Sequence, residues 1–164
     1  MTEPERQAWP RRGRFLDDFA VGDRFEHWPG RTITETDNIQ FSLLTMNRHP
    51  LHCDSNFAAA SEFGRPLVNS GLTLAIVLGM TVDDVSFNAI ANLGWTDIVL
   101  KAPVFPGDTI YARSDVLAVR HSRTRPGQGV VTTRTEAFKQ CGTVFMTFER
   151  SCLVPVRDRL EQPS

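Results

Sequence analysis

The sequence lacks the features that mark membrane, secreted and nucleic-acid-binding proteins. Its longest apolar stretch, Leu72 to Met80, is far too short to cross a bilayer. The three cysteines (Cys53, Cys141 and Cys152) are scattered and odd in number. No signal peptide is recognisable, so we expect reduced thiols and a cytoplasmic protein without a membrane partner. The formal net charge of -1 leaves no dominant basic field, which argues against a nucleic-acid partner.

What remains is the composition of an ordinary globular domain. The chain has 164 residues, of which 41% are hydrophobic and 23% charged, enough for one domain with a core of its own. Internal repeats and low-complexity segments are lacking as well. We expect a polar, flexible N-terminal tail over residues 1–14, one domain over 15–156 and a C-terminal tail over 157–164.

Three helices are predicted in the first half of the domain. A capping-box pattern at 34–37, with Ile39, Leu43 and Met46 at helical spacing, predicts a helix over 35–46. Asp54 is a suitable cap for a short helix that Gly64 closes. The segment from Ser70 to Met80 is apolar on nearly every side, so protein must surround that helix.

The chain after residue 88 reads as β-strands. We expect strands over 88–102, 109–120, 130–139 and 143–154, the last two forming a hairpin around Cys141-Gly142. A short strand also follows the turn at 21–23. One buried helix with a run of long antiparallel strands predicts an α+β domain, with the sheet curled around the helix.

His52 is the first candidate for chemistry. It follows the turn Asn47-Arg48-His49-Pro50 and lies just before the helix that Asp54 caps. A neutral imidazole can take up or give a proton near pH 7. The alternative is a turn histidine that only hydrogen-bonds the backbone.

Gly71 is the second candidate. It lies at the start of the apolar helix, and a residue without a side chain lets a ligand approach the backbone closely. A free N–H there, aided by the helix dipole, suits a thioester oxygen that becomes an enolate. The alternative is a glycine needed only for packing under the sheet.

Other readings of the polar residues are weaker. His49, His52 and Cys53 lack the second pair of ligands that a metal site needs. Asp54 reads as a helix cap. Arg120, Arg123 and Arg125 lie in or beside a flexible loop and could meet the phosphates of a nucleotide-containing substrate, although a run of charge is usually a solvated loop.

At this point several short motifs, in order, resemble one known family. Residues 47–54 (NRHPLHCD), 63–68 (FGRPLV) and Ser70-Gly71, followed by 101–104 (KAPV) and 106–108 (PGD), are similar to the MaoC-like family of R-specific enoyl-CoA hydratases. The resemblance spans residues 15–154. It implies a hot-dog fold, an antiparallel sheet wrapped around one long helix, and a homodimer or a dimer of dimers.

The resemblance also implies roles for individual residues. His52 matches the catalytic histidine of the family pattern Asp-x-Asn-Pro-(Leu/Ile)-His, and Gly71 matches the glycine whose N–H polarises the thioester carbonyl. Asn47 stands in the place of the family aspartate, and His49 replaces the asparagine before proline. Ser70 stands where many members have histidine. An amide cannot take up a proton as a carboxylate does, yet it can orient a water.

These expectations combine into a hypothesis of function with alternatives. The first hypothesis is reversible hydration of a 2-enoyl-CoA or carrier-protein thioester, in which His52, Asn47 and Gly71 are catalytic. Ser70, His49, Arg123 and Arg125 would bind the substrate. No metal or other cofactor is implied, since CoA enters with the substrate. The motif wording is most similar to members acting on branched dicarboxylic acyl-CoAs of the mesaconyl or itaconyl type. The alternatives are a hot-dog thioesterase and a non-catalytic acyl-thioester-binding protein.

Overall fold

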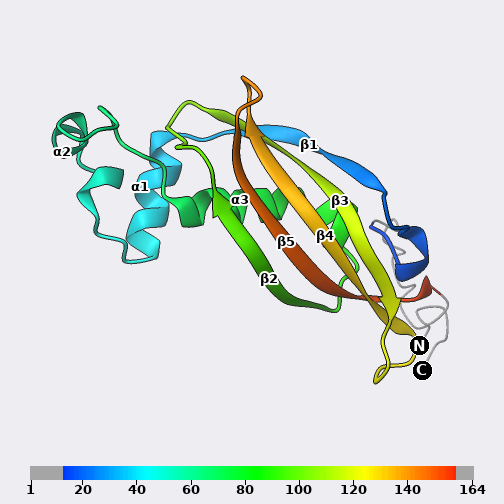
Figure 1. Ribbon diagram of the computed structural model, residues 1–164. Helices are drawn as coiled ribbons and strands as arrows, with labels where there is room; N and C mark the ends of the chain where they lie inside the picture. The colour runs from blue at the N-terminus through cyan, green and yellow to red at the C-terminus, as the bar shows by residue number, and fades with distance from the viewer. Residues whose placement is uncertain (1–12, 158–164) are drawn as a thin grey trace, which may run out of the picture.

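An antiparallel five-stranded sheet dominates the computed structural model, which describes residues 13–157. Its strand order is β1-β3-β4-β5-β2, so that β1 and β2 are the two edges (Figure 1). The strands are β1 (Arg24–Thr32), β2 (Ala91–Leu100), β3 (Thr109–His121), β4 (Gln128–Lys139) and β5 (Val144–Pro155). β4 and β5 form the predicted hairpin, with Gln128 paired to Pro155 at its open end.

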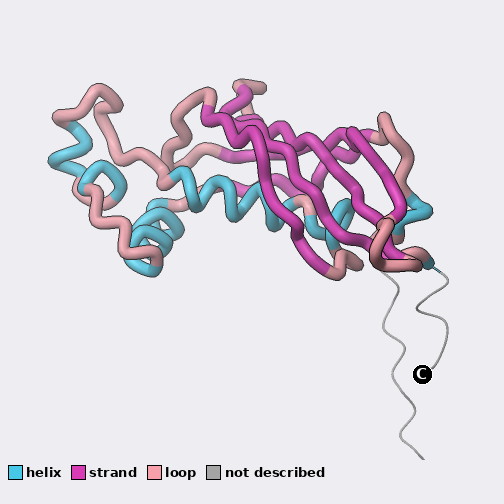
Figure 2. Tube along the Cα trace, turned by 60° about the horizontal axis from the view of Figure 1, so that its bottom comes forward, coloured by secondary structure: helices cyan, strands magenta, loops and turns pink. Residues whose placement is uncertain are grey.

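Helix α3 (Ser70–Met80) lies along one face of this sheet, and the two smaller helices lie beyond one end of it (Figures 1 and 2). Those two helices are α1 (Glu35–Leu44) and α2 (Ser55–Ala59). Leu72 and Val77 of α3 pack in one buried cluster with side chains of β3, β4 and β5, including Ala137 and Phe148. The domain is therefore α+β with the hot-dog arrangement, as predicted.

Most predicted elements are present with small differences at their ends. The bounds of α3 are the predicted ones, because Asn69 caps the helix with its side-chain oxygen. Asp54 caps α2 as expected, accepting the N–H of Phe57, but the helix ends at Ala59 rather than near Gly64. None of the helices among residues 13–157 is long and apolar enough to cross a membrane.

The predicted tails fall mostly outside the described residues, which exclude 1–12 and 158–164. Arg14 and Arg157, the described residues at the inner ends of these tails, are attached to the domain. Arg14 donates a hydrogen bond of 3.0 Å to the carboxylate of Asp84 and lies over the ring of Phe25. Arg157 pairs with Asp18.

Helix α1 buries a different face from the one that carries its exposed apolar residues. Its buried residues are Asn38 and Ser42. Leu43, Leu44 and Met46 are 72%, 84% and 74% exposed. The spacing of apolar residues predicted the helix correctly. Asn38 and Ser42 are buried because their polar side chains have hydrogen-bonding partners inside the domain.

Asn38 is the residue through which α1 holds the neighbouring loops. It has no exposed surface. Its amide group donates to the carbonyl oxygens of His52, at 2.9 Å, and of Leu67, at 3.1 Å. Its own oxygen accepts the N–H of Asn69 at 2.8 Å. One buried side chain therefore joins α1, the 3-10 helix η2 (Pro50–His52) and the residue that caps α3.

The Pro106-Gly107-Asp108 motif forms the corner before β3. The carboxylate of Asp108 accepts hydrogen bonds from the Phe105 N–H at 3.0 Å and from the Lys139 ammonium at 3.3 Å. Burial alone would raise the pKa of Asp108, but these donors hold it below its usual value. The corner fixes where the segment between β2 and β3 leaves the sheet.

We predict that Asn38→Leu destabilises the domain by about 2–5 kcal/mol, because the His52 carbonyl and the Asn69 N–H lose their side-chain partner and the Leu67 carbonyl loses one of its two. Urea unfolding followed by circular dichroism would measure this loss. Asn56→Leu, on the exposed surface of α2, is the matched control and should change the free energy of unfolding by no more than about 0.5 kcal/mol. A cost at Asn38 as small as that of the control would refute the joining role.

We predict that Asp108→Asn lowers the free energy of unfolding at pH 7 by about 1–3 kcal/mol. Since folding lowers the pKa of Asp108, its carboxylate stabilises the folded state above the unfolded-chain value of about 4. This contribution is lost as the pH falls through the folded-state value. Urea titrations of both proteins at several pH values should therefore converge in acid. A difference that does not change with pH would contradict the prediction.

Candidate active site

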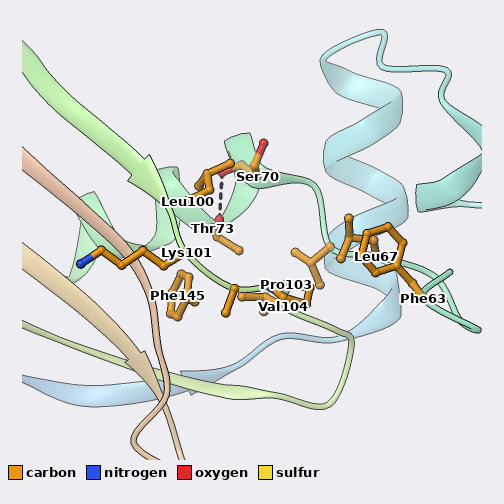
Figure 3. Close-up of a pocket in the computed structure, with 11 residues that line it drawn as sticks. Phe63, Leu67, Ser70, Thr73, Leu100, Lys101, Pro103, Val104 and Phe145 are labelled. Carbon is orange, nitrogen blue, oxygen red and sulfur yellow. Dashed lines mark hydrogen bonds between the residues drawn. The ribbon is translucent and has the colours of Figure 1, made fainter.

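A small apolar cavity opens where the start of α3 meets the end of β2. Its volume is about 320 Å³. Figure 3 shows Ser70 and Thr73 of α3 on one side and Phe145 of β5 on another, with the amine of Lys101 pointing away from the other labelled residues. The lining residues are Phe63, Leu67, Val68, Ser70, Thr73, Leu100, Lys101, Ala102, Pro103, Val104 and Phe145. The predicted site residue Ser70 belongs to this cavity, whereas His52, Asn47 and Gly71 do not line it.

His52 is attached to the wall of the cavity through Leu67. The ring nitrogen Nδ1 lies 2.8 Å from the carbonyl oxygen of Leu67. A carbonyl oxygen only accepts hydrogen bonds, so Nδ1 carries the hydrogen, and in the neutral ring Nε2 is left as an acceptor. The N–H of Leu67 in turn donates to the carbonyl of Leu51 at 3.0 Å. His52 is thus held in the tautomer that a general base requires.

His49 lies beside His52, and Asn47 is hydrogen-bonded to the backbone of His49. The side-chain oxygen of Asn47 accepts the N–H of His49 at 3.1 Å, which leaves the amide N–H groups as its free end. Nδ1 of His49 accepts the N–H of Leu51 at 3.2 Å, so that in the neutral ring Nε2 is a donor. The rings of His49 and His52 are 6.0 Å apart. Both Asn47 and His49 can therefore donate to a water or a substrate oxygen.

The first N–H groups of α3 differ in availability. The Gly71 N–H, which was expected to polarise a carbonyl, donates at 2.9 Å to the side-chain oxygen of Asn69. The N–H groups of Leu72 and Thr73 bond to the backbone oxygen of Asn69. Within residues 13–157, the Ser70 N–H has no such acceptor. A substrate oxygen would meet Ser70 N–H without rearrangement, whereas Gly71 N–H becomes free only when the Asn69 cap opens.

The structure separates Arg123 and Arg125 from the other predicted site residues. Both lie in the turn between β3 and β4, at the opposite end of the sheet from α1 and α2 (Figure 1). They line a different cavity, together with Arg120. Within one chain they do not line the cavity whose wall is bonded to His52. Spacing in the sequence could not reveal this separation, which follows from the strand order.

A second histidine, His27, has the hydrogen-bonding pattern of a Ser-His-Asp catalytic triad, but it is buried and no substrate can reach it. Nδ1 of His27 lies 2.9 Å from the Asp84 carboxylate, and Nε2 lies 2.8 Å from the hydroxyl of Ser114. Ser114 has no exposed surface and also contacts the Thr135 hydroxyl. Burial alone would raise the pKa of Asp84, but hydrogen bonds from His27 and Arg14 lower it. The cluster joins β1, β3 and β4 to the helical turn at 82–86.

Two asparagines that position the site were missed by sequence reasoning. Asn69 directly precedes an apolar helix, and asparagine is among the preferred capping residues. Its role as the cap of α3 could therefore have been predicted from the sequence. Asn38 gave no signal, because the partners of a buried amide depend on the tertiary structure. Among residues 13–157, no cluster of three or more His, Cys, Asp or Glu side chains could hold a metal ion.

Comparisons with known proteins agree on one family. The sequence-family profile of mesaconyl-CoA hydratase matches residues 2–163. The mesaconyl-CoA hydratase of Cereibacter sphaeroides is 34% identical over 89% of this chain, which covers 42% of that protein. The beta-methylmalyl-CoA dehydratase of Chloroflexus aurantiacus is 36% identical over 89% of this chain and is covered to 41%.

A solved structure matches the chain along nearly its whole length. The MaoC-like dehydratase of Rhodospirillum rubrum superimposes with a TM-score of 0.77 at 27% identity, covering 88% of this chain and 99% of that one. The chain thus spans about two fifths of these two curated relatives but nearly all of this MaoC-like dehydratase. By profile, by sequence and by fold, the chain belongs to the mesaconyl-CoA hydratase family of MaoC-like hot-dog proteins.

Proposed function

We propose that this protein catalyses the reversible addition of water to a 2-enoyl-CoA thioester. The observation that carries the proposal is the fixed tautomer of His52, whose Nδ1 is held by the Leu67 carbonyl and whose Nε2 is left as an acceptor. Three residues after Leu67, α3 begins beside an apolar cavity of about 320 Å³. A base and a helix N-terminus are the two groups that the reaction needs.

The reaction proceeds with His52 as the only acid and base. Nε2 takes a proton from water as the water oxygen bonds to the β-carbon of the enoyl group. The π electrons move onto the thioester oxygen, and the resulting enolate is stabilised by the Ser70 N–H and, once the Asn69 cap opens, by the Gly71 N–H. The protonated His52 then returns the proton to the α-carbon. Water addition changes no net oxidation state, so the reaction calls for no redox cofactor.

Asn47 and His49 orient the reactants in this scheme. Asn47 donates its free amide hydrogen to the attacking water, since its oxygen already accepts the His49 N–H. His49 and Ser70 bind polar groups of the substrate. The relatives named for mesaconyl-CoA and beta-methylmalyl-CoA support a short, branched dicarboxylic acyl group, and the small size of the cavity agrees with a short acyl chain.

A second copy of the chain is the proposed partner. The edge strand β2 exposes Leu93, Trp95, Ile98, Val99 and Leu100, each by more than two fifths. An edge strand of this kind is a template for pairing with another strand. Helix α3, apolar on nearly every side, leaves Ala75 and Gly79 exposed. Because these surfaces suit a self-complementary contact, we propose a homodimer through β2 or a dimer of such dimers.

We predict that His52→Asn and His52→Ala both lower turnover on an enoyl-CoA by about 100-fold or more. The asparagine amide can still donate to the Leu67 carbonyl but offers no base at the place of Nε2, so this variant separates chemistry from anchoring. The measurement is the loss of enoyl absorbance, with unfolding curves as the control for folding. Near-normal turnover in the folded His52→Asn protein would exclude His52 as the base.

We predict that Asn47→Asp retains activity with its pH optimum moved upward. One carboxylate oxygen can accept the His49 N–H, while the other adds a negative charge that favours the protonated ring of His52. Asn47→Leu should abolish turnover, because nothing then orients the water. Initial rates across a pH series measure both effects. If Asn47→Leu is as active as wild type, residue 47 lies outside the site.

A wild-type protein that binds enoyl-CoA without turnover would favour the acyl-binding alternative, for which the absence of a carboxylate at Asn47 is the motivation. In that case Asn47→Asp is the change expected to create activity. Release of free thiol from the substrate would instead identify a thioesterase.

A further inference from the structure

Asn47 and His49 have hydrogen-bond acceptors that the backbone of their own turn already occupies. The side-chain oxygen of Asn47 accepts the His49 N–H at 3.1 Å, and Nδ1 of His49 accepts the Leu51 N–H at 3.2 Å. The polar groups that remain are the two amide hydrogens of Asn47 and, in the neutral ring, the Nε2 hydrogen of His49. The pair is therefore suited to an oxygen that accepts hydrogen bonds.

The ring of His49 is held in place before any ligand arrives. Phe57 of α2 packs against it edge-on, with ring centroids 6.1 Å apart and planes at 83°. The bond from the Leu51 N–H fixes the ring from within its own turn. The His49 carbonyl also accepts the His52 N–H at 3.2 Å, so that the two histidines belong to one hydrogen-bonded segment. A donor that is already ordered loses little conformational entropy on binding.

His49 lies within reach of a group on the carbon that water attacks. The rings of His49 and His52 are 6.0 Å apart. An attacking water lies about 3 Å from the nitrogen of the base, and the carbon lies about 3–3.5 Å from the water oxygen. The β-carbon of the enoyl group is therefore on the order of 6 Å from Nε2 of His52. This is comparable with the separation of the two rings, so a short polar substituent on that carbon can meet His49.

The acyl cavity, in contrast, offers little to a negatively charged group. Its polar lining residues are Ser70, Thr73 and Lys101. The Thr73 hydroxyl donates to the Ser70 carbonyl at 2.9 Å, and the Lys101 amine points away from the other labelled residues (Figure 3). A carboxylate among apolar side chains is strongly disfavoured unless it is paired. The cavity therefore suits the hydrocarbon part of a substrate, and a carboxylate has to bind elsewhere.

The replacement of a carboxylate by an amide at residue 47 favours an anionic ligand. The family pattern has aspartate there, and Asn47 has the same size without the charge. An aspartate would repel a second carboxylate placed beside it, whereas the amide adds donors. Asp54, the nearest acid along the chain, already accepts the Phe57 N–H at 2.9 Å as the cap of α2. The loss of the family acid is thus explained by the binding of an anion.

We infer that Asn47 and His49 bind a carboxylate carried by the β-carbon of the enoyl group, the carbon that water attacks. The inference rests on the proposed function and specifies its substrate as a butenedioyl thioester. One amide hydrogen of Asn47 orients the water. The other amide hydrogen and the His49 Nε2 hydrogen hold the carboxylate, which adjoins the water because both are attached to one carbon. The product is a 2-hydroxy acid.

The first test uses substrates that differ at the β-carbon. Fumaryl-CoA carries a carboxylate there and crotonyl-CoA a methyl group, whereas the carboxylate of glutaconyl-CoA is one methylene farther away. Wild type should show a kcat/KM for fumaryl-CoA at least about 10-fold higher than for either of the other two. Loss of enoyl absorbance measures the rates. A wild-type preference for crotonyl-CoA or glutaconyl-CoA would overturn the inference.

The second test restores a negative charge at residue 47. Asn47→Asp should lower the ratio of kcat/KM for fumaryl-CoA to that for crotonyl-CoA by about 10- to 100-fold. The activity that this variant retains should thus be found on crotonyl-CoA. Asn56→Asp, which adds the same charge on the exposed surface of α2, is the matched control and should change the ratio by no more than about twofold. An unchanged ratio in Asn47→Asp, or an equal fall in the control, would refute direct contact.

The third test separates substrate contact by His49 from its support of the turn. In His49→Asn the new side-chain oxygen can still accept the Leu51 N–H, but the amide is shorter than the imidazole and does not reach as far. The same ratio should fall by about 10-fold or more. His121→Asn, at the exposed end of β3, is the control and should leave the ratio unchanged. A purely structural role of His49 would lower both rates equally, and that outcome would overturn the inference.

Binding of saturated analogues separates a failure of this inference from a failure of the proposed function. Succinyl-CoA and butyryl-CoA have no double bond to hydrate and differ by the same exchange of carboxylate for methyl. By calorimetry, wild type should bind succinyl-CoA at least about 10-fold more tightly than butyryl-CoA. Asn47→Asp and His49→Asn should each lose most of this preference. If wild type hydrates no enoyl-CoA but this pattern holds, the function is wrong and the carboxylate site stands. Equal binding of both analogues by wild type would refute the carboxylate site whatever the activity.

Discussion

The buried amide of Asn38 is the constraint on which the candidate site depends. A fully buried amide destabilises a fold unless its hydrogen-bonding groups are satisfied. Asn38 meets this condition only when the carbonyls of His52 and Leu67 and the N–H of Asn69 converge on it. The same convergence brings His52 to the segment that starts α3. The stability of this end of the domain and the geometry of the proposed chemistry thus have one physical cause.

Helix α1 shows how far the sequence predicts this structure. Periodicity identified the helix, because Ile39, Leu43 and Met46 recur at its spacing. The usual inference that such a face is buried failed, since Asn38 and Ser42 occupy the interior and Leu43 and Met46 are exposed. Burial patterns assume that water surrounds a single chain. A helix whose polar residues form internal hydrogen bonds, and whose apolar residues are free to meet a partner, violates that assumption.

Part of the candidate site could be predicted from the sequence. His52 and the start of α3 were proposed as candidates, and in the structure the His52 ring is bonded to the Leu67 carbonyl, three residues before α3. The sequence could not show that the Gly71 N–H is already hydrogen-bonded. Its acceptor is the side chain of Asn69, whose orientation depends on the backbone conformation before α3. The arginines of the β3–β4 turn were noticed for their charge, but only the folded structure showed that this turn lies at the end of the sheet away from α1 and α2 (Figure 1).

The central claim is that His52 and the start of α3 add water to a thioester and leave the thioester bond intact. The most direct measurement is mass spectrometry of an enoyl-CoA incubated with the wild-type protein, with free thiol titrated in the same samples. The account predicts a product heavier by one water, an equilibrium reached from either side, and no thiol above the level of a protein-free control. Thiol release in proportion to substrate loss, or an unchanged substrate under all conditions, would contradict it.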